Sequence, residues 1–76
     1  MKDIKEFIQD KHDECDRKSI IWENQIRECT EQMKSAETDE DIQAFKFQRQ
    51  ECLGNMNELL AVKYFCSQLL TSYFSD

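Results

Sequence analysis

Apolar side chains recur along the chain at alternating steps of four and three residues, in two long stretches. We call each resulting stripe a seam. The first seam comprises Ile8, His12, Cys15, Ser19, Trp22, Ile26, Cys29, Met33 and Ala36, and the second Ile42, Phe45, Arg49, Cys52, Met56, Leu59, Lys63, Cys66, Leu70 and Tyr73. This spacing places the seam residues on one face of an α-helix. The pattern predicts two amphipathic helices, over residues 4–36 and 41–73.

The stretch between the two helices, residues 37–41, has the composition of a turn followed by a helix start. Thr38 and Asp41 have the spacing of a capping box, and Asp39, Glu40 and Asp41 favour the positive end of a helix dipole. Helices joined by so short a connection are antiparallel neighbours. We therefore expect an all-α fold: one domain, residues 1–76, that forms an antiparallel two-helix hairpin.

Composition supports a helical chain and narrows its partners. Proline is absent and glycine occurs once among 76 residues, which disfavours turns. The net charge of −6 and the scattered Lys and Arg residues make nucleic acid a poor partner. The N-terminus has neither the apolar core of a signal peptide nor an Arg-rich presequence, and no stretch is apolar and long enough to span a bilayer. A domain this small also needs staples, oligomerisation or a larger complex for stability.

Four cysteines occupy matching seam positions. Thirteen residues separate Cys15 from Cys29, and thirteen separate Cys52 from Cys66. When the chain is folded at its predicted turn, Cys15 faces Cys66 and Cys29 faces Cys52, because the residue numbers of each pair add up to 81. Facing positions of a tight helix pair can meet the Cα distance that a disulfide needs. Of the three possible pairings, geometry favours Cys15 with Cys66 and Cys29 with Cys52.

Two disulfides would staple the hairpin, each stabilising it by roughly 3 to 4 kcal/mol when taken alone. The alternatives are reduced thiols, packed as small apolar side chains, and a structural zinc ion. Zinc is disfavoured because closely spaced cysteine pairs are absent from the sequence. We expect no metal and no cofactor.

The two Cys-x13-Cys segments flanking a turn resemble the twin CX(n)C, or coiled-coil-helix-coiled-coil-helix (CHCH), family of the mitochondrial intermembrane space. The commonest pattern in that family has nine intervening residues where this chain has thirteen. The resemblance implies two nested disulfides, import without a cleaved presequence, and a role as accessory subunit or assembly factor of an inner-membrane respiratory complex.

The second helix carries apolar residues outside its seam. Measured around the helix from Cys66, one set lies on the opposite face and another on a flank. These residues predict a surface that binds other protein chains. The predicted partner-binding residues are Leu53, Leu60 and Tyr64, together with Phe47, Phe65 and Phe74.

Two helices provide a seam rather than a pocket with converging groups, so we expect a protein that is not an enzyme. The lone His12 is interpreted as a polar seam residue, satisfied by water or a carboxylate. The leading hypothesis is a structural subunit or assembly factor of a mitochondrial respiratory complex, located in the intermembrane space. The alternatives are a cytoplasmic homodimer with reduced cysteines, forming a four-helix bundle that acts as a regulator or adaptor, and a small chaperone.

Overall fold

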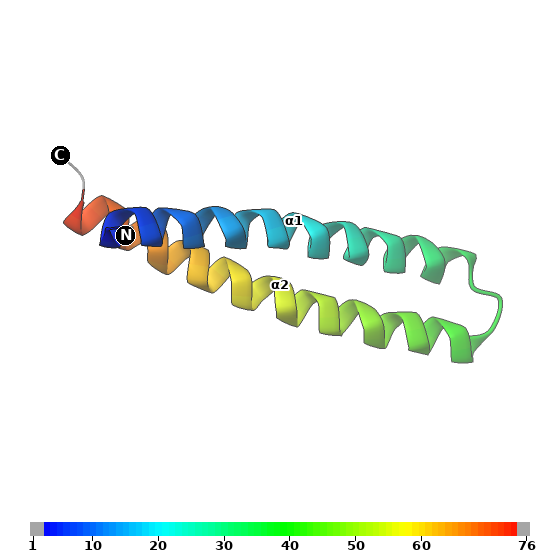
Figure 1. Cartoon of the computed structure of the whole chain (residues 1–76). Coiled ribbons are helices and arrows are strands. Elements are labelled where there is room, and N and C mark those ends of the chain that lie inside the picture. Colours follow the sequence, from blue (N-terminus) through cyan, green and yellow to red (C-terminus); the bar gives the residue numbers. More distant parts are fainter. Residues whose placement is uncertain (1–2, 75–76) are drawn as a thin grey trace.

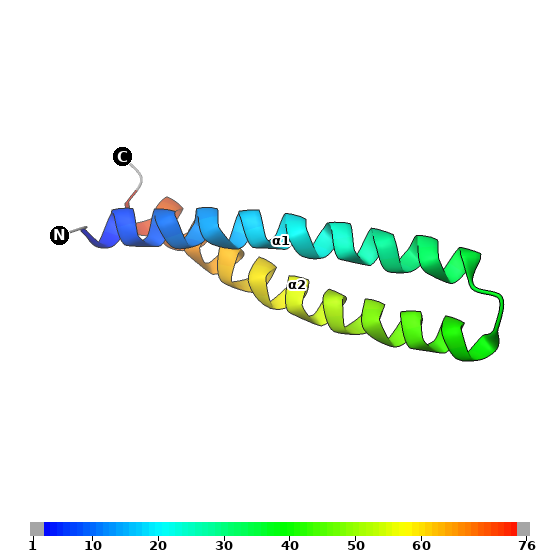
Figure 2. The same cartoon turned by 45° about the vertical axis from the view of Figure 1, so that its right-hand side comes forward.

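The computed structural model describes residues 3–74 and consists of two long helices, α1 (Ile4–Ser35) and α2 (Asp39–Tyr73). They run antiparallel and lie side by side, with the turn at one end and both chain ends at the other (Figures 1 and 2). The molecule measures 55 × 20 × 17 Å. No strand occurs within residues 3–74. The predicted all-α hairpin is confirmed.

Both helices begin at a side chain that caps their first turn. The Asp3 carboxylate accepts a hydrogen bond from the Glu6 backbone N–H at 2.8 Å, and the Thr38 hydroxyl accepts one from the Asp41 N–H at 3.2 Å. Such caps satisfy backbone donors that have no partner within the helix. Because Thr38 is the cap, α2 begins at Asp39 rather than at residue 41, and the predicted turn over residues 37–41 is shorter than expected, at residues 36–38.

The seam forms the contact between the helices. Only four of the described residues are buried, namely Cys15, Ser19, Cys29 and Cys66. The other predicted seam residues are partly buried, with one exception. A pair of helices thus shares a line of contact but encloses almost no core, as expected for so small a domain.

Tyr73 is the exception, because its side chain is 77% exposed. The prediction that it lies in the seam between the helices is wrong. A straight α-helix has 3.6 residues per turn, so a strict seven-residue repeat drifts by about 20° per heptad. At the last turn of α2, the partly buried positions are Leu69, Leu70 and Phe74 instead.

No helix within residues 3–74 combines the length and the apolar character needed to cross a bilayer.

Candidate functional site: cysteine rungs and an exposed apolar surface

The four cysteines all lie at the contact between α1 and α2. Cys15, Cys29 and Cys66 are buried, with exposed fractions of 1%, 4% and 6%, and Cys52 is partly buried. All four are present as thiols in the structure. We call the pairs that the sequence predicts to face each other, Cys15 with Cys66 and Cys29 with Cys52, the two cysteine rungs.

The rung nearer the turn brings two thiols together. The Cys29 thiol donates a weak hydrogen bond to Oε1 of Gln48 at 4.0 Å. The pKa of the Cys52 thiol is raised, first by burial and then by the charge and hydrogen bond of the neighbouring Cys29. Cys29 therefore faces the turn of α2 that contains Gln48 and Cys52. This placement agrees with the register inferred from the sequence.

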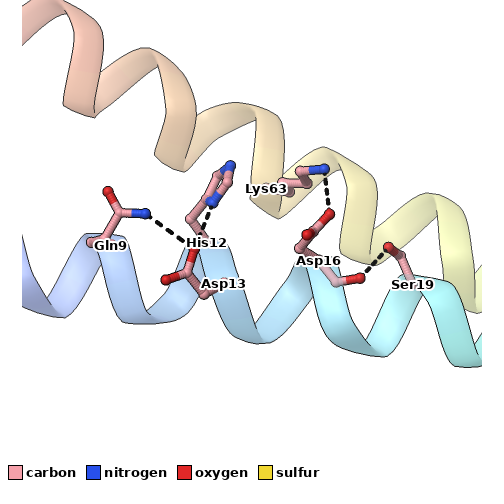
Figure 3. A network of polar contacts seen from close by, with 6 residues as sticks. All are labelled: Gln9, His12, Asp13, Asp16, Ser19 and Lys63. Atoms are coloured by element: carbon pink, nitrogen blue, oxygen red, sulfur yellow. Dashed lines mark hydrogen bonds and ion pairs between the residues drawn. The ribbon is translucent and has the colours of Figure 1, made fainter.

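The rung nearer the chain ends is flanked by an ion pair between the helices. Nζ of Lys63 donates to Oδ1 of Asp16 at 2.6 Å (Figure 3). Asp16 directly follows Cys15, and Lys63 lies three residues before Cys66. The hydrogen bond and charge of Lys63 lower the pKa of the Asp16 carboxyl group. Asp16 and Lys63 therefore hold the two helices in the register that this rung requires.

Further polar groups surround this ion pair. The buried Ser19 hydroxyl donates to the backbone carbonyl of Asp16 at 2.8 Å, so it needs no partner on α2. The His12 ring extends from α1 toward α2, and its Nδ1 lies 3.2 Å from Oδ1 of Asp13, which also accepts from Gln9 (Figure 3). The structure thus pairs His12 with a carboxylate, one of the two partners expected for a polar seam residue.

Arg49 and Lys63, the two long cations of the second seam, have different surroundings. Lys63 reaches Asp16, whereas Nε of Arg49 is buried without a hydrogen-bond partner in the part of the chain that the structure describes. A buried donor without a partner weakens the helix contact at its level. Within residues 3–74, no group of three or more His, Cys, Asp or Glu side chains is arranged to hold a metal ion.

The predicted partner-binding residues, which lie in α2 and at its C-cap Phe74, divide into two groups. Tyr64, Phe47 and Phe65 are 66%, 62% and 61% exposed, and Leu60 is 39% exposed. Leu53 and Phe74 are partly buried, so a partner can reach less of their side chains than of the other four.

Leu53 is partly buried because the seam winds around α2. Leu53 lies thirteen residues before Cys66 in α2. A seam that keeps its seven-residue repeat turns by about 40° over two heptads, and this turn brings Leu53 toward α1. At the end of α2 the partly buried aromatic side chain is Phe74, whereas Tyr73 is exposed. We call Leu60 and Tyr64, with Leu53 and Phe74 at the partly covered edge, the docking stripe.

Comparison with known proteins identifies no relative. No family model, no curated protein and no solved structure matches the chain. The candidate functions below therefore depend on the geometry of the hairpin and on the spacing of its cysteines.

A second apolar surface follows the other side of the seam and was not recognised as a unit from the sequence. An open groove there is lined by Ile21 and Trp22 from α1 and by Leu59 and Val62 from α2, with Lys18 and Glu58 at its rims. Ile21 and Val62 are 59% and 40% exposed. The available signal was that Ile21 and Val62 each directly precede a seam residue, Trp22 and Lys63, whereas Leu60 directly follows one, Leu59.

Proposed function

We propose that this chain is a non-catalytic structural protein, an accessory subunit or assembly factor that binds other protein chains through the docking stripe. The observation that carries this proposal is the exposure of Leu60 and Tyr64, at 39% and 66%, on a helix whose seam is already occupied by α1. Large apolar side chains gathered on one surface mark protein-binding sites, and tyrosine is enriched at the centre of such interfaces. The Tyr64 hydroxyl accepts a hydrogen bond from Gln68 at 3.0 Å, which helps to fix its position.

The mechanism that we propose is binding by a rigid, pre-ordered hairpin. Disulfides between Cys15 and Cys66 and between Cys29 and Cys52 would staple the two helices. Support comes from the placement of all four cysteines at the helix contact and from the Cys29 thiol next to Cys52. A surface that is ordered before binding loses less conformational entropy when its partner binds.

The cellular setting that we propose is the mitochondrial intermembrane space, within an inner-membrane respiratory complex. This part of the proposal depends on the resemblance of the cysteine spacing to the CHCH family. An oxidising compartment of this kind would allow both staples to form and persist. The hairpin meets the structural requirement for these staples, because the cysteines of both rungs lie at the contact between its two helices.

Purification of the tagged chain from its own source, with identification and quantification of co-purifying proteins, tests the docking stripe. We expect Leu60→Ser with Tyr64→Ser to lose a partner that the unchanged chain retains. Burying two side chains of this size contributes up to about 1.5 to 3 kcal/mol each, so occupancy should fall by one or more orders of magnitude.

The matched control is Val62→Ser, since Val62 is 40% exposed on the same helix but lies in the groove on the other side of the seam. It should retain the partner. If the double variant recovers every partner at the yield of the unchanged chain, the docking stripe is not the interface. Phe47 with Phe65 is then the next surface to test.

A further inference from the structure

The hairpin exposes more surface than a compact protein of its mass. Its accessible surface is 6030 Å² for a mass of 9.1 kDa. Folded monomers of this mass expose about 4,900 Å², so the excess is on the order of 1,100 Å². One partner in a stable interface of standard size contributes about 800 Å². The excess is therefore sufficient for one protein–protein interface along the hairpin.

Both helices contribute side chains to the groove formed by Ile21, Trp22, Leu59 and Val62. Trp22 and Leu59 are partly buried seam residues, whereas Ile21 and Val62 extend the apolar surface outward on either rim. The groove thus continues the helix contact toward one side of the hairpin. A further pair of helices placed there would enlarge the existing contact into the core of a four-helix bundle.

We propose that a second copy of this chain occupies the groove, and that two hairpins form a four-helix bundle. A two-fold axis parallel to the helices places α1 of one copy against α2 of the other, so every pair of neighbouring helices is antiparallel. Ile21 and Val62 lie at nearly the same level of the hairpin, because the residue numbers of facing positions add up to about 81. The same axis therefore brings Ile21 of each copy against Val62 of the other.

The charges at the rims fit the same arrangement. Lys18 lies on the α1 rim and Glu58 on the α2 rim, so the two-fold axis places opposite charges on facing rims at two symmetric places. In the single hairpin, Lys18 is bound to Glu14 of its own helix at 2.7 Å, an exposed contact that a second acidic partner can share. The net charge of −6 on each copy opposes association, and salt screens this repulsion. The dissociation constant of the dimer should therefore be lower at about 0.5 M NaCl, where charges are strongly screened, than at about 0.02 M NaCl, where they are weakly screened.

Analytical ultracentrifugation of the full chain, reduced and at concentrations from micromolar to about 0.1 mM, tests the proposal. We expect a monomer–dimer equilibrium that Val62→Glu and Ile21→Glu each weaken at least tenfold, since every substitution occurs twice in a symmetric dimer. Each variant has a control at a similarly exposed residue outside the groove. Leu60→Glu is the control for Val62→Glu, since the two side chains are 39% and 40% exposed. Ile20→Glu is the control for Ile21→Glu, since these neighbours are 52% and 59% exposed. Both controls should dimerise like the unchanged chain.

Circular dichroism of each variant verifies that the helices remain. If an apolar-to-charged variant unfolds, the charge exchange Lys18→Glu with Glu58→Lys provides a second test of the dimer. Each single reversal should weaken the dimer, and the double exchange should restore it. A chain that stays monomeric throughout the concentration range overturns the proposal. So does a dimer that Leu60→Glu and Val62→Glu weaken equally. Neither result affects the docking stripe, which is tested by partner recovery with Leu60 and Tyr64 changed.

Discussion

Asp16 and Lys63, 47 positions apart in the chain, form the ion pair that joins the two helices at 2.6 Å. It lies beside the Cys15 and Cys66 rung, and its side chains are 49% and 33% exposed. Ion pairs this accessible to solvent contribute little to stability. Their geometry nevertheless favours one register of two sliding helices over its neighbours. Register decides which cysteines face each other, so this contact matters more for pairing than for stability.

The first prediction concerns the pH dependence of this contact. Lys63 lowers the pKa of Asp16 in the folded state, so the ionised carboxylate stabilises the fold above the unfolded pKa, and the stabilisation is lost as pH falls through the folded pKa. Asp16→Asn should therefore be slightly less stable than the unchanged chain at neutral pH, with the difference shrinking below about pH 4. Urea unfolding at several pH values measures it.

A suitable control is Glu23→Gln, because Glu23 pairs only loosely with Arg27 of its own helix, at 3.9 Å. This variant should change stability less than Asp16→Asn at neutral pH. A difference for Asp16→Asn that stays constant down to pH values well below about 3.9, the ordinary pKa of Asp, would contradict the assigned role of the ion pair.

Gly54 lies in the middle of α2, where a glycine weakens a helix. It is exposed, its φ is not positive, and an added Cβ would meet nothing within 4 Å. Gly54→Ala should therefore stabilise the isolated chain by about 0.5 to 1 kcal/mol, through lower backbone entropy in the unfolded state. Ala61→Gly, one heptad further along and also exposed, should have the opposite effect. Destabilisation by Gly54→Ala in urea titrations would indicate a close contact at this position and refute the prediction.

Ser19 reports how closely the helices approach beside the rung near the chain ends. Its side chain is buried, and its hydroxyl is already satisfied by the Asp16 carbonyl. Ser19→Ala should therefore cost no more than about 1 kcal/mol, whereas Ser19→Leu should destabilise the hairpin by about 1 to 3 kcal/mol through overpacking. Thermal unfolding of the two variants compares them. If leucine were tolerated as well as alanine, the helices could not be in close contact at this level.

The sequence was sufficient for the fold because two periodic signals agreed. The seam defined the faces of both helices, and Thr38 marked the start of the second one; its side chain is indeed the cap. The cysteine positions independently indicated where the chain turns. The mirror point of that pairing, between Glu40 and Asp41, lies in the first turn of α2, two to three residues beyond the observed connection at residues 36–38.

The surfaces were harder to predict, because a fixed helical wheel ignores how the seam winds. This is why Leu53, which is partly buried, was placed on the face opposite the seam. Tyr73 was placed in the contact for another reason: it continues the seven-residue repeat beyond Cys66, but it is 77% exposed because the contact does not follow that repeat into the last turn of α2. The groove between Ile21 and Val62 was missed for a different reason. It is shared by two helices, and only the register of the folded hairpin brings its two rims to the same level.

The pairing of the cysteines is the claim on which the rigid-hairpin mechanism depends, and a peptide map of the native protein tests it most directly. The protein is isolated from its own compartment with immediate alkylation, then digested without reductant. Linked peptides joining Cys15 to Cys66 and Cys29 to Cys52 are the predicted result. Four alkylated thiols, or linkage of Cys15 to Cys29 or of Cys15 to Cys52, would contradict it.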